Sequence, residues 1–225
     1  MGQEGRQARL NDRVATEVGK ANDGMLELKD GSLSIDGQIV FHNLSFVVRP
    51  GELKTISADY HHAVVEVMLG FRALDEGWAT LEGELMTARS ARLLRSQMVY
   101  IPAELPVWDG SGQAPKVSAL LHAPFGLESC EESFSKRGLL TEWEKLNIDP
   151  ASYDRRVDEV DSRTLRCMIL SVAGVLQRPV VVAEILHDSS LASIDVECRY
   201  LRSLADSGRA VLLATNKVEM LNAQL

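Results

Sequence analysis

Three short apolar runs constrain the fold of this chain more than any other feature of its sequence. The runs are Met98–Ile101, Val180–Ala183 and Val211–Ala214, and none of them contains a charged residue. Strands of a parallel sheet that helices cover on both faces have this composition, because neither side of the strand meets water. We therefore predict an α/β core built on a parallel sheet.

Helical periodicity precedes the last two of these runs. From Leu165 the apolar positions follow helical spacing, and this helix ends at Arg178-Pro179, directly before the second run. Another helix contains Cys198–Ala205 and stops at Ser207-Gly208, ahead of the third run. The alternation of helix and strand supports a sheet whose strands run in one direction.

The N-terminal part of the chain has a different pattern. Between residues 25 and 48, short apolar segments are separated by turns such as Asp36-Gly37, which predicts an antiparallel β layer. A short strand at Leu53–Ile56 then leads through a loop to a helix at Ala63–Leu69, and Gly70 ends that helix.

Two further segments complete the predicted organisation. Residues 1–24 are polar, of mixed charge and poor in apolar groups, so we expect a flexible tail ahead of one domain at 25–225. Within that domain, residues from about 107 to 161 hold helical stretches between Gly and Pro breaks. This stretch is predicted to be an inserted helical subdomain.

Composition excludes several functional classes. The net charge is −8 with acids and bases mixed along the chain, which argues against a general nucleic-acid binder. The cysteines, Cys130, Cys167 and Cys198, have no metal-ligand spacing, and we expect reduced thiols in the cytoplasm. No apolar run is long enough to cross a bilayer, so any association with the inner face of a membrane is expected through a partner.

A family resemblance appears when the motifs are taken in order. The stretch Asn43–Leu53, followed by a strand, a loop and a helix that ends at Leu69-Gly70-Phe71, resembles the opening of an ATP-binding cassette (ABC) ATPase. The similarity covers roughly residues 25 to 217. It continues through Leu74–Gly77, Leu81–Gly83, Val99–Pro102, Gln177–Pro179, Ser193–Asp195 and Ser207–Thr215. The resemblance implies a P-loop-NTPase-like parallel sheet with an N-terminal antiparallel β layer and an inserted helical subdomain.

The phosphate loop of the family is altered in this chain. In the family, glycines let backbone N–H groups point at the phosphates, a Lys neutralises them and a Ser or Thr holds Mg²⁺. The corresponding loop here contains neither Gly nor Lys, and Asp59 adds a negative charge. We therefore expect ordinary phosphate binding to be lost. The residues of this degenerate loop are Ser57, Ala58, Asp59, Tyr60, His61, His62 and Ala63.

Other positions that handle ATP in the family are altered too. The aromatic residue that stacks on adenine falls near Ile35, and the glutamine that follows the strand at Val99 falls at Ala103. The signature segment keeps Ser162 but has no glycines, and the switch histidine falls at Asn216. Since these changes all weaken nucleotide handling, the loop is not an isolated substitution.

The Asp-Glu pair that holds magnesium and activates water in the family is missing after Val180–Ala183. Glu184 or Asp188 is a remnant candidate, but a carboxylate at the end of a buried strand also serves as a cap or in a salt bridge. His61 and His62 with Asp59 could be imagined as a metal site, yet adjacent side chains point apart and no third ligand is near in sequence. Exposed loop histidines and no metal are expected.

Partner binding is the alternative use of such a scaffold. The family receives a helix of its membrane partner in the groove between the helical subdomain and the core. Ala103, Glu104 and Trp108 are the candidate partner-binding residues here. For Trp108 and Trp143, a local hydrophobic core is the favoured explanation over a partner groove.

Three functional hypotheses follow. The first is a pseudo-ATPase: a non-catalytic ABC subunit without a cofactor, which supports assembly by pairing with a catalytic ABC protein, with itself or with a membrane permease. The second is an ATP-hydrolysing protein with a rebuilt site, the one case in which ATP and Mg²⁺ are expected. The third is a soluble adaptor that has left transport.

Overall fold

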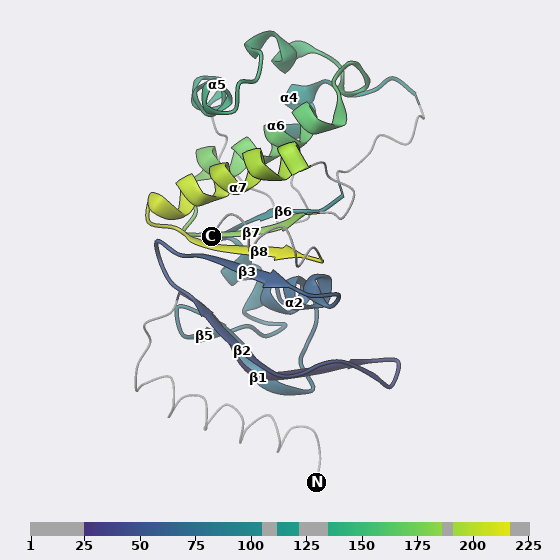
Figure 1. Cartoon of the computed structure of the whole chain (residues 1–225), viewed down its shortest axis with the longest axis vertical. Helices are drawn as coiled ribbons and strands as arrows, with labels where there is room; N and C mark the ends of the chain where they lie inside the picture. The colour runs from purple at the N-terminus through teal and green to yellow at the C-terminus, as the bar shows by residue number, and fades with distance from the viewer. Residues whose placement is uncertain (1–24, 105–111, 122–134, 186–190, 217–225) are drawn as a thin grey trace.

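The computed structural model describes residues 25–104, 112–121, 135–185 and 191–216. It has two sheets, one antiparallel and one parallel, with helices between and above them (Figure 1). The predicted α/β core with an N-terminal antiparallel layer is confirmed. The predicted tail at 1–24 lies outside the described residues, and the limits of the inserted subdomain remain a prediction.

The antiparallel sheet has the strand order β2-β1-β4-β5. Asp36 and Gly37 join β1 to β2 with φ values of 53° and 79°, the left-handed conformation that a tight two-residue hairpin turn needs. The register between β1 and β2 shifts at three places, so this hairpin is irregular. The strands are β1 (Leu26–Ile35), β2 (Gln38–Val48), β4 (Glu76–Leu81) and β5 (Glu84–Leu85).

The parallel sheet has the strand order β3-β8-β7-β6. All three predicted runs are strands of it, and β7 and β8 extend one or two residues beyond the predicted limits. Residues along β7 alternate between two cores, because successive side chains of a strand point to opposite faces. The strands are β3 (Leu53–Ser57), β6 (Met98–Ile101), β7 (Val180–Ile185) and β8 (Ala210–Thr215).

Helices cover both faces of the parallel sheet. In Figure 1, α2 lies between the two sheets, whereas α6 and α7 cover the opposite face and α4 and α5 lie beyond them. None of the described helices has the length and hydropathy to span a membrane. The helices are α2 (His61–Met68), α3 (Ala91–Arg95), α4 (Val117–Leu121), α5 (Lys136–Lys145), α6 (Ser162–Leu176) and α7 (Leu191–Asp206), with 3₁₀ turns at Pro150–Asp154 and Val157–Glu159.

Local chemistry fixes the ends of α6. The Asp161 carboxylate accepts a hydrogen bond from the Thr164 amide at 2.9 Å, which caps the helix and lowers the pKa of Asp161. Gln177 follows the last turn with a φ of 49°, a left-handed cap ahead of Pro179. The helix thus ends where the sequence predicts.

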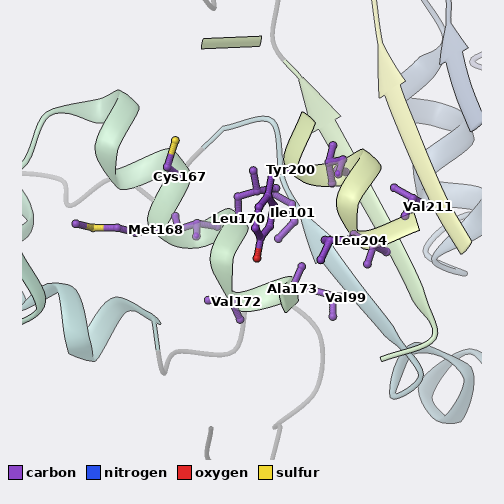
Figure 2. Close-up of a cluster of buried hydrophobic side chains, with 14 of the residues drawn as sticks. Val99, Ile101, Cys167, Met168, Leu170, Val172, Ala173, Tyr200, Leu204 and Val211 are labelled. Carbon is purple, nitrogen blue, oxygen red and sulfur yellow. The ribbon is translucent and has the colours of Figure 1, made fainter. Parts of the chain in front are cut away.

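Packing above the sheet joins α5 to α6 and α7. Figure 2 shows the cluster in which Tyr200 and Leu204 of α7 meet the α6 side chains. The fully buried Trp143 of α5 donates its indole N–H to Ser171 Oγ at 3.0 Å, so the local-core interpretation is correct for this tryptophan. Trp108 lies outside the described residues.

A glycine makes this helix contact close. The Tyr200 hydroxyl donates to Glu142 Oε2 at 2.7 Å directly above Gly174 of α6. A Cβ at Gly174 would lie 2.2 Å from the Tyr200 hydroxyl and 2.5 Å from Glu142 Oε2. The buried hydrogen bond therefore requires glycine at this position.

We predict that Gly174→Ala destabilises the protein by about 2–4 kcal/mol, because the added methyl group breaks the Tyr200–Glu142 bond and overpacks the helix contact. Urea unfolding followed by circular dichroism measures the loss. Gly138→Ala in α5 is the matched control, since its nearest contact is at 3.3 Å and a helical Gly→Ala change is favourable by about 0.5–1 kcal/mol. Equal stability of the two variants would contradict the prediction.

Candidate functional site

The candidate site lies at the carboxyl ends of the parallel strands. Ligands of open α/β sheets bind at this edge, because the loops after the strands converge there. Ser57 ends β3 beside Thr215, which ends β8, and Ile185 ends β7 on the other side of Thr215. The loop of Ser57–Ala63 therefore stands at the expected edge.

The loop between β3 and α2 is short and tightly bonded. The Ala58 amide donates to Thr215 O at 3.0 Å, and the His61 amide donates to Ala58 O at 3.0 Å. Helix α2 begins at His61, two residues before the predicted Ala63, so both histidines are helical rather than loop residues. Across Ser57–Ala63, which the structure describes in full, no residue has a positive φ. The alternating left-handed geometry of a phosphate-binding nest is therefore missing from this loop.

Tyr60 ties the loop to the antiparallel layer. Its ring lies 5.6 Å from the ring of Phe41 in β2, in a tilted arrangement that aromatic pairs favour. Ile35, the position near which the family places its adenine-stacking residue, packs against the same hydrophobic cluster as Tyr60. An apolar contact thus joins the loop to the sheet below it.

Glu184 is the buried carboxylate of the site. Only 1% of it is exposed, although it lies on β7, and both of its oxygens have partners from other elements. His62 Nδ1 of α2 lies 2.9 Å from Oε1, and the Tyr100 hydroxyl of β6 donates to Oε2 at 2.5 Å. A carboxylate only accepts, so this hydrogen bond forms with the His62 tautomer that carries a proton on Nδ1. His62 is exposed, as expected, although its ring also pairs with Glu184, whereas His61 is half-buried.

The neighbours of Glu184 determine the protonation state of Tyr100. Burial raises the pKa of the phenol well above its ordinary value, and the hydrogen bond to Glu184 raises it further. Tyr100 therefore remains protonated near neutral pH and acts as a donor to the carboxylate.

Arg166 of α6 is a member of the site that sequence reasoning missed. Its guanidinium donates to Pro102 O after β6, to Glu184 O in β7 and to Glu197 Oε2 of α7, the last at 3.0 Å. Both charged side chains are almost fully buried, which is tolerated because they pair. The one available signal was an arginine beside the apolar stripe that begins at Leu165.

Two buried polar atoms at this edge have no hydrogen-bond partner among the residues that the structure describes. They are Ser57 Oγ at the end of β3 and Asn216 Oδ1 directly after β8. A buried group without a partner costs about 1–3 kcal/mol, so such groups are rare and are found at functional positions. The strand ends beside the loop therefore carry two polar atoms, Ser57 Oγ and Asn216 Oδ1.

The remaining predicted residues are not joined to this network. Ser162 is the exposed first residue of α6, Ala103 is half-buried after β6, and Glu104 is exposed. Trp108 and Asp188 fall outside the described residues. Within the described ranges, no three His, Cys, Asp or Glu side chains cluster as metal ligands would.

The described cysteines are not activated. Burial raises the pKa of Cys167 and raises that of Cys198 to about 11. Both thiols are therefore protonated near neutral pH, and neither has the depressed pKa of a nucleophilic cysteine.

The fold of this chain is similar to that of several solved ABC transporter proteins. No protein-family model and no curated protein matches the chain. Among solved structures, cbiO1 from Clostridium perfringens, part of the ABC transporter complex cbiONQ, matches with a TM-score of 0.70 at 11% identity, over 89% of this chain and 82% of that one. An ATP-binding subunit of an ABC transporter matches with a TM-score of 0.66 at 18% identity, over 89% and 82%. The ADP conformation of an ABC transporter cassette matches with a TM-score of 0.70 at 14% identity, over 89% and 84%. These likenesses establish the fold.

We predict an energetic coupling of about 0.5–2 kcal/mol between His62 and Glu184, because removing either partner leaves the other without its hydrogen bond. The free energies of unfolding in urea of the wild type, His62→Ala, Glu184→Gln and the double variant form a double-mutant cycle that gives this coupling energy. Glu184→Gln should be the more destabilising single change, since the residue is buried whereas the His62 side chain is 64% exposed. Additive single effects would show that the contact contributes nothing.

The pKa values of Tyr100 and Tyr200 are both raised by burial and by carboxylate partners, Glu184 and Glu142 respectively. The folded state holds these protons more tightly than the unfolded chain, so the stabilisation is complete below about pH 10 and declines as the pH rises beyond it. Urea midpoints measured from pH 8 to 11 should fall more steeply for the wild type than for Tyr100→Phe/Tyr200→Phe. Identical slopes would contradict this assignment.

Proposed function

We propose that this chain, which has the fold of an ABC transporter ATP-binding subunit, is a non-catalytic subunit with a structural or regulatory role in an ABC transporter-like assembly. The observation that carries the proposal is the pairing of Glu184 with His62 and Tyr100. The chain's own side chains occupy Glu184, the remnant candidate for the Asp-Glu pair that holds magnesium and activates water in the family.

The state of Glu184 is unfavourable for catalysis. A general base needs an oxygen free to take a proton, and a magnesium ligand needs one free to coordinate. Oε1 faces the imidazole and Oε2 accepts from the phenol, whose raised pKa keeps its proton in place. Either role would require these contacts to break first.

The loop supports the same conclusion on the phosphate side. Its backbone lacks positive φ values, so its amides do not form a nest, and the exposed Asp59 repels an approaching polyanion. The Tyr60 ring packs against Phe41, and this contact holds the loop against the antiparallel sheet. Entry of a nucleotide would therefore have to displace an aromatic contact and overcome charge repulsion.

A chain that keeps the fold but has no working nucleotide site can still serve by binding another subunit of the assembly. We propose a protein partner, either a catalytic ABC subunit, a second copy of this chain or a membrane permease, with Ala103, Glu104 and Trp108 at the partner surface. The protein would then be cytoplasmic and would meet the membrane only through that partner.

A rebuilt nucleotide site is the second candidate function. The unpartnered Ser57 Oγ and Asn216 Oδ1 favour it, because a ligand that donates and accepts hydrogen bonds would satisfy both. This candidate requires a cation for the phosphates, and His62 is already engaged with Glu184.

We predict no detectable heat when the purified chain is titrated with Mg-ATP or with ADP to millimolar concentration, because the loop offers no phosphate cradle. A catalytic ABC subunit titrated under the same conditions is the positive control. Micromolar binding, or an ATPase rate that Glu184→Gln abolishes, would overturn the non-catalytic role and favour the rebuilt site.

A further inference from the structure

His62 presents a ring nitrogen to solvent at the edge of the parallel sheet. Its Nδ1 donates to Glu184 Oε1 at 2.9 Å, and 64% of its side chain is exposed. Because Nδ1 points at a carboxylate that is only 1% exposed, the exposed side of the ring is the opposite one, which carries Nε2. With the proton on Nδ1, Nε2 keeps the lone pair of the ring. A nucleophilic atom is therefore accessible at this position.

The buried carboxylate behind the ring favours reaction at Nε2. When Nε2 attacks an electrophile, the imidazole gains positive charge, and the hydrogen bond from Nδ1 to Glu184 becomes a bond between opposite charges. Little water screens this attraction, because Glu184 is buried. A carboxylate that orients a histidine and stabilises its charged form is a recurring means of activating the ring.

The other described histidines lack such a carboxylate. His61 Nδ1 lies 2.9 Å from Ala58 O, and its ring therefore meets an uncharged carbonyl. His42 Nδ1 lies 3.0 Å from Ser32 Oγ, which is an uncharged hydroxyl. A hydrogen bond between neutral groups is about half as strong as a charge-assisted one. His61 and His42 thus serve as controls within the same chain.

The start of α2 favours an anionic group on His62. Helix α2 has no side-chain cap at Tyr60 and no acidic residue in its first turn. The amides of His62 and Ala63 have no acceptor among the described residues. Side chains of a first turn lean toward the helix N-terminus, where free amides and the helix dipole attract negative charge. A phosphoryl group is therefore an electrophile that suits this position.

We propose that His62 Nε2 is a phosphorylation site, which accepts a phosphoryl group from a donor of the phosphoramidate class, in which phosphorus is bound to nitrogen. The Nε2 lone pair forms the new N–P bond while the P–N bond of the donor breaks. The nitrogen of the zwitterionic donor already carries its protons and leaves as the neutral amine, and Nδ1 keeps its proton. Because one P–N bond replaces another, the transfer needs no further energy source.

This modification goes beyond the proposed function and requires no nucleotide. A covalent bond holds one phosphoryl group without the cradle that the phosphates of a nucleotide need. Asp59 opposes the added charge, but its carboxylate is exposed in the loop, where solvent and salt screen it. The phosphoryl group would add about two negative charges at the start of α2.

The test treats the full chain with potassium phosphoramidate at about pH 8, where free imidazoles are neutral, and locates the label by mass spectrometry of alkaline digests. His62 should be labelled about tenfold faster than His61 or His42, and phosphorus NMR should identify the Nε2 isomer. In urea the preference should vanish, since His62 and Glu184 are 122 positions apart. Equal labelling of the three folded histidines, labelling at Nδ1, or a preference that persists in urea would overturn the proposal.

Matched variants separate the carboxylate from the stability of the fold. Glu184→Gln should slow labelling of His62 by about fivefold or more, because an amide does not compensate the charged ring. The control is Glu142→Gln, the same change at a buried carboxylate of α5, which lies on the opposite face of the parallel sheet from α2 (Figure 1). It should leave the rate within about twofold. Circular dichroism melting checks that both variants are folded in the assay. Equal rates in the two variants would contradict the role of Glu184 and with it the proposal.

Calorimetry with Mg-ATP on the same preparation keeps this inference apart from the non-catalytic role. Heat from nucleotide together with selective labelling of His62 would overturn the non-catalytic role and leave the phosphorylation site standing. No heat from nucleotide and no selective labelling would do the opposite.

Discussion

The buried carboxylate of Glu184 is the constraint on which the site depends. A carboxyl group with 1% exposure is costly to bury unless hydrogen-bond partners surround it, and here the partners come from separate elements. His62 at the start of α2 and Tyr100 of β6 contact the two carboxylate oxygens of Glu184. Arg166 of α6 donates a hydrogen bond to the backbone carbonyl of Glu184. The contacts that compensate the buried Glu184 therefore hold α2, β6 and α6 in place around β7.

The architecture was predictable because its signals are local. Apolar runs without charge predict buried strands, and the left-handed turn at Asp36-Gly37 follows from residue types that adopt that conformation. Trp143 was harder, since its large apolar ring fits a partner surface as well as a core. Its complete burial and its hydrogen bond to Ser171 decide for the core.

The site was less predictable because its members are distant in sequence. His62 and Glu184 are 122 positions apart, and nothing in either neighbourhood indicates that they pair. The role of Arg166 could not be predicted for a similar reason, because a charged side chain beside an apolar stripe is usually solvated. Its burial is explained by its hydrogen bonds to Glu197 and to the backbone carbonyls of Pro102 and Glu184. The absence of glycine from the loop, by contrast, was visible directly, and it agrees with a loop backbone that has no positive φ.

The irregular register of the β1–β2 hairpin affects how copies of the protein meet. Among the described strands β2 is outermost in its sheet, a position where an ordinary flat strand would invite another chain to extend the sheet. Shifts in register and the left-handed Asn43, with a φ of 53°, interrupt the row of unpaired backbone groups on β2. These irregularities make β2 a poorer template for edge-to-edge pairing than a flat, regular strand would be.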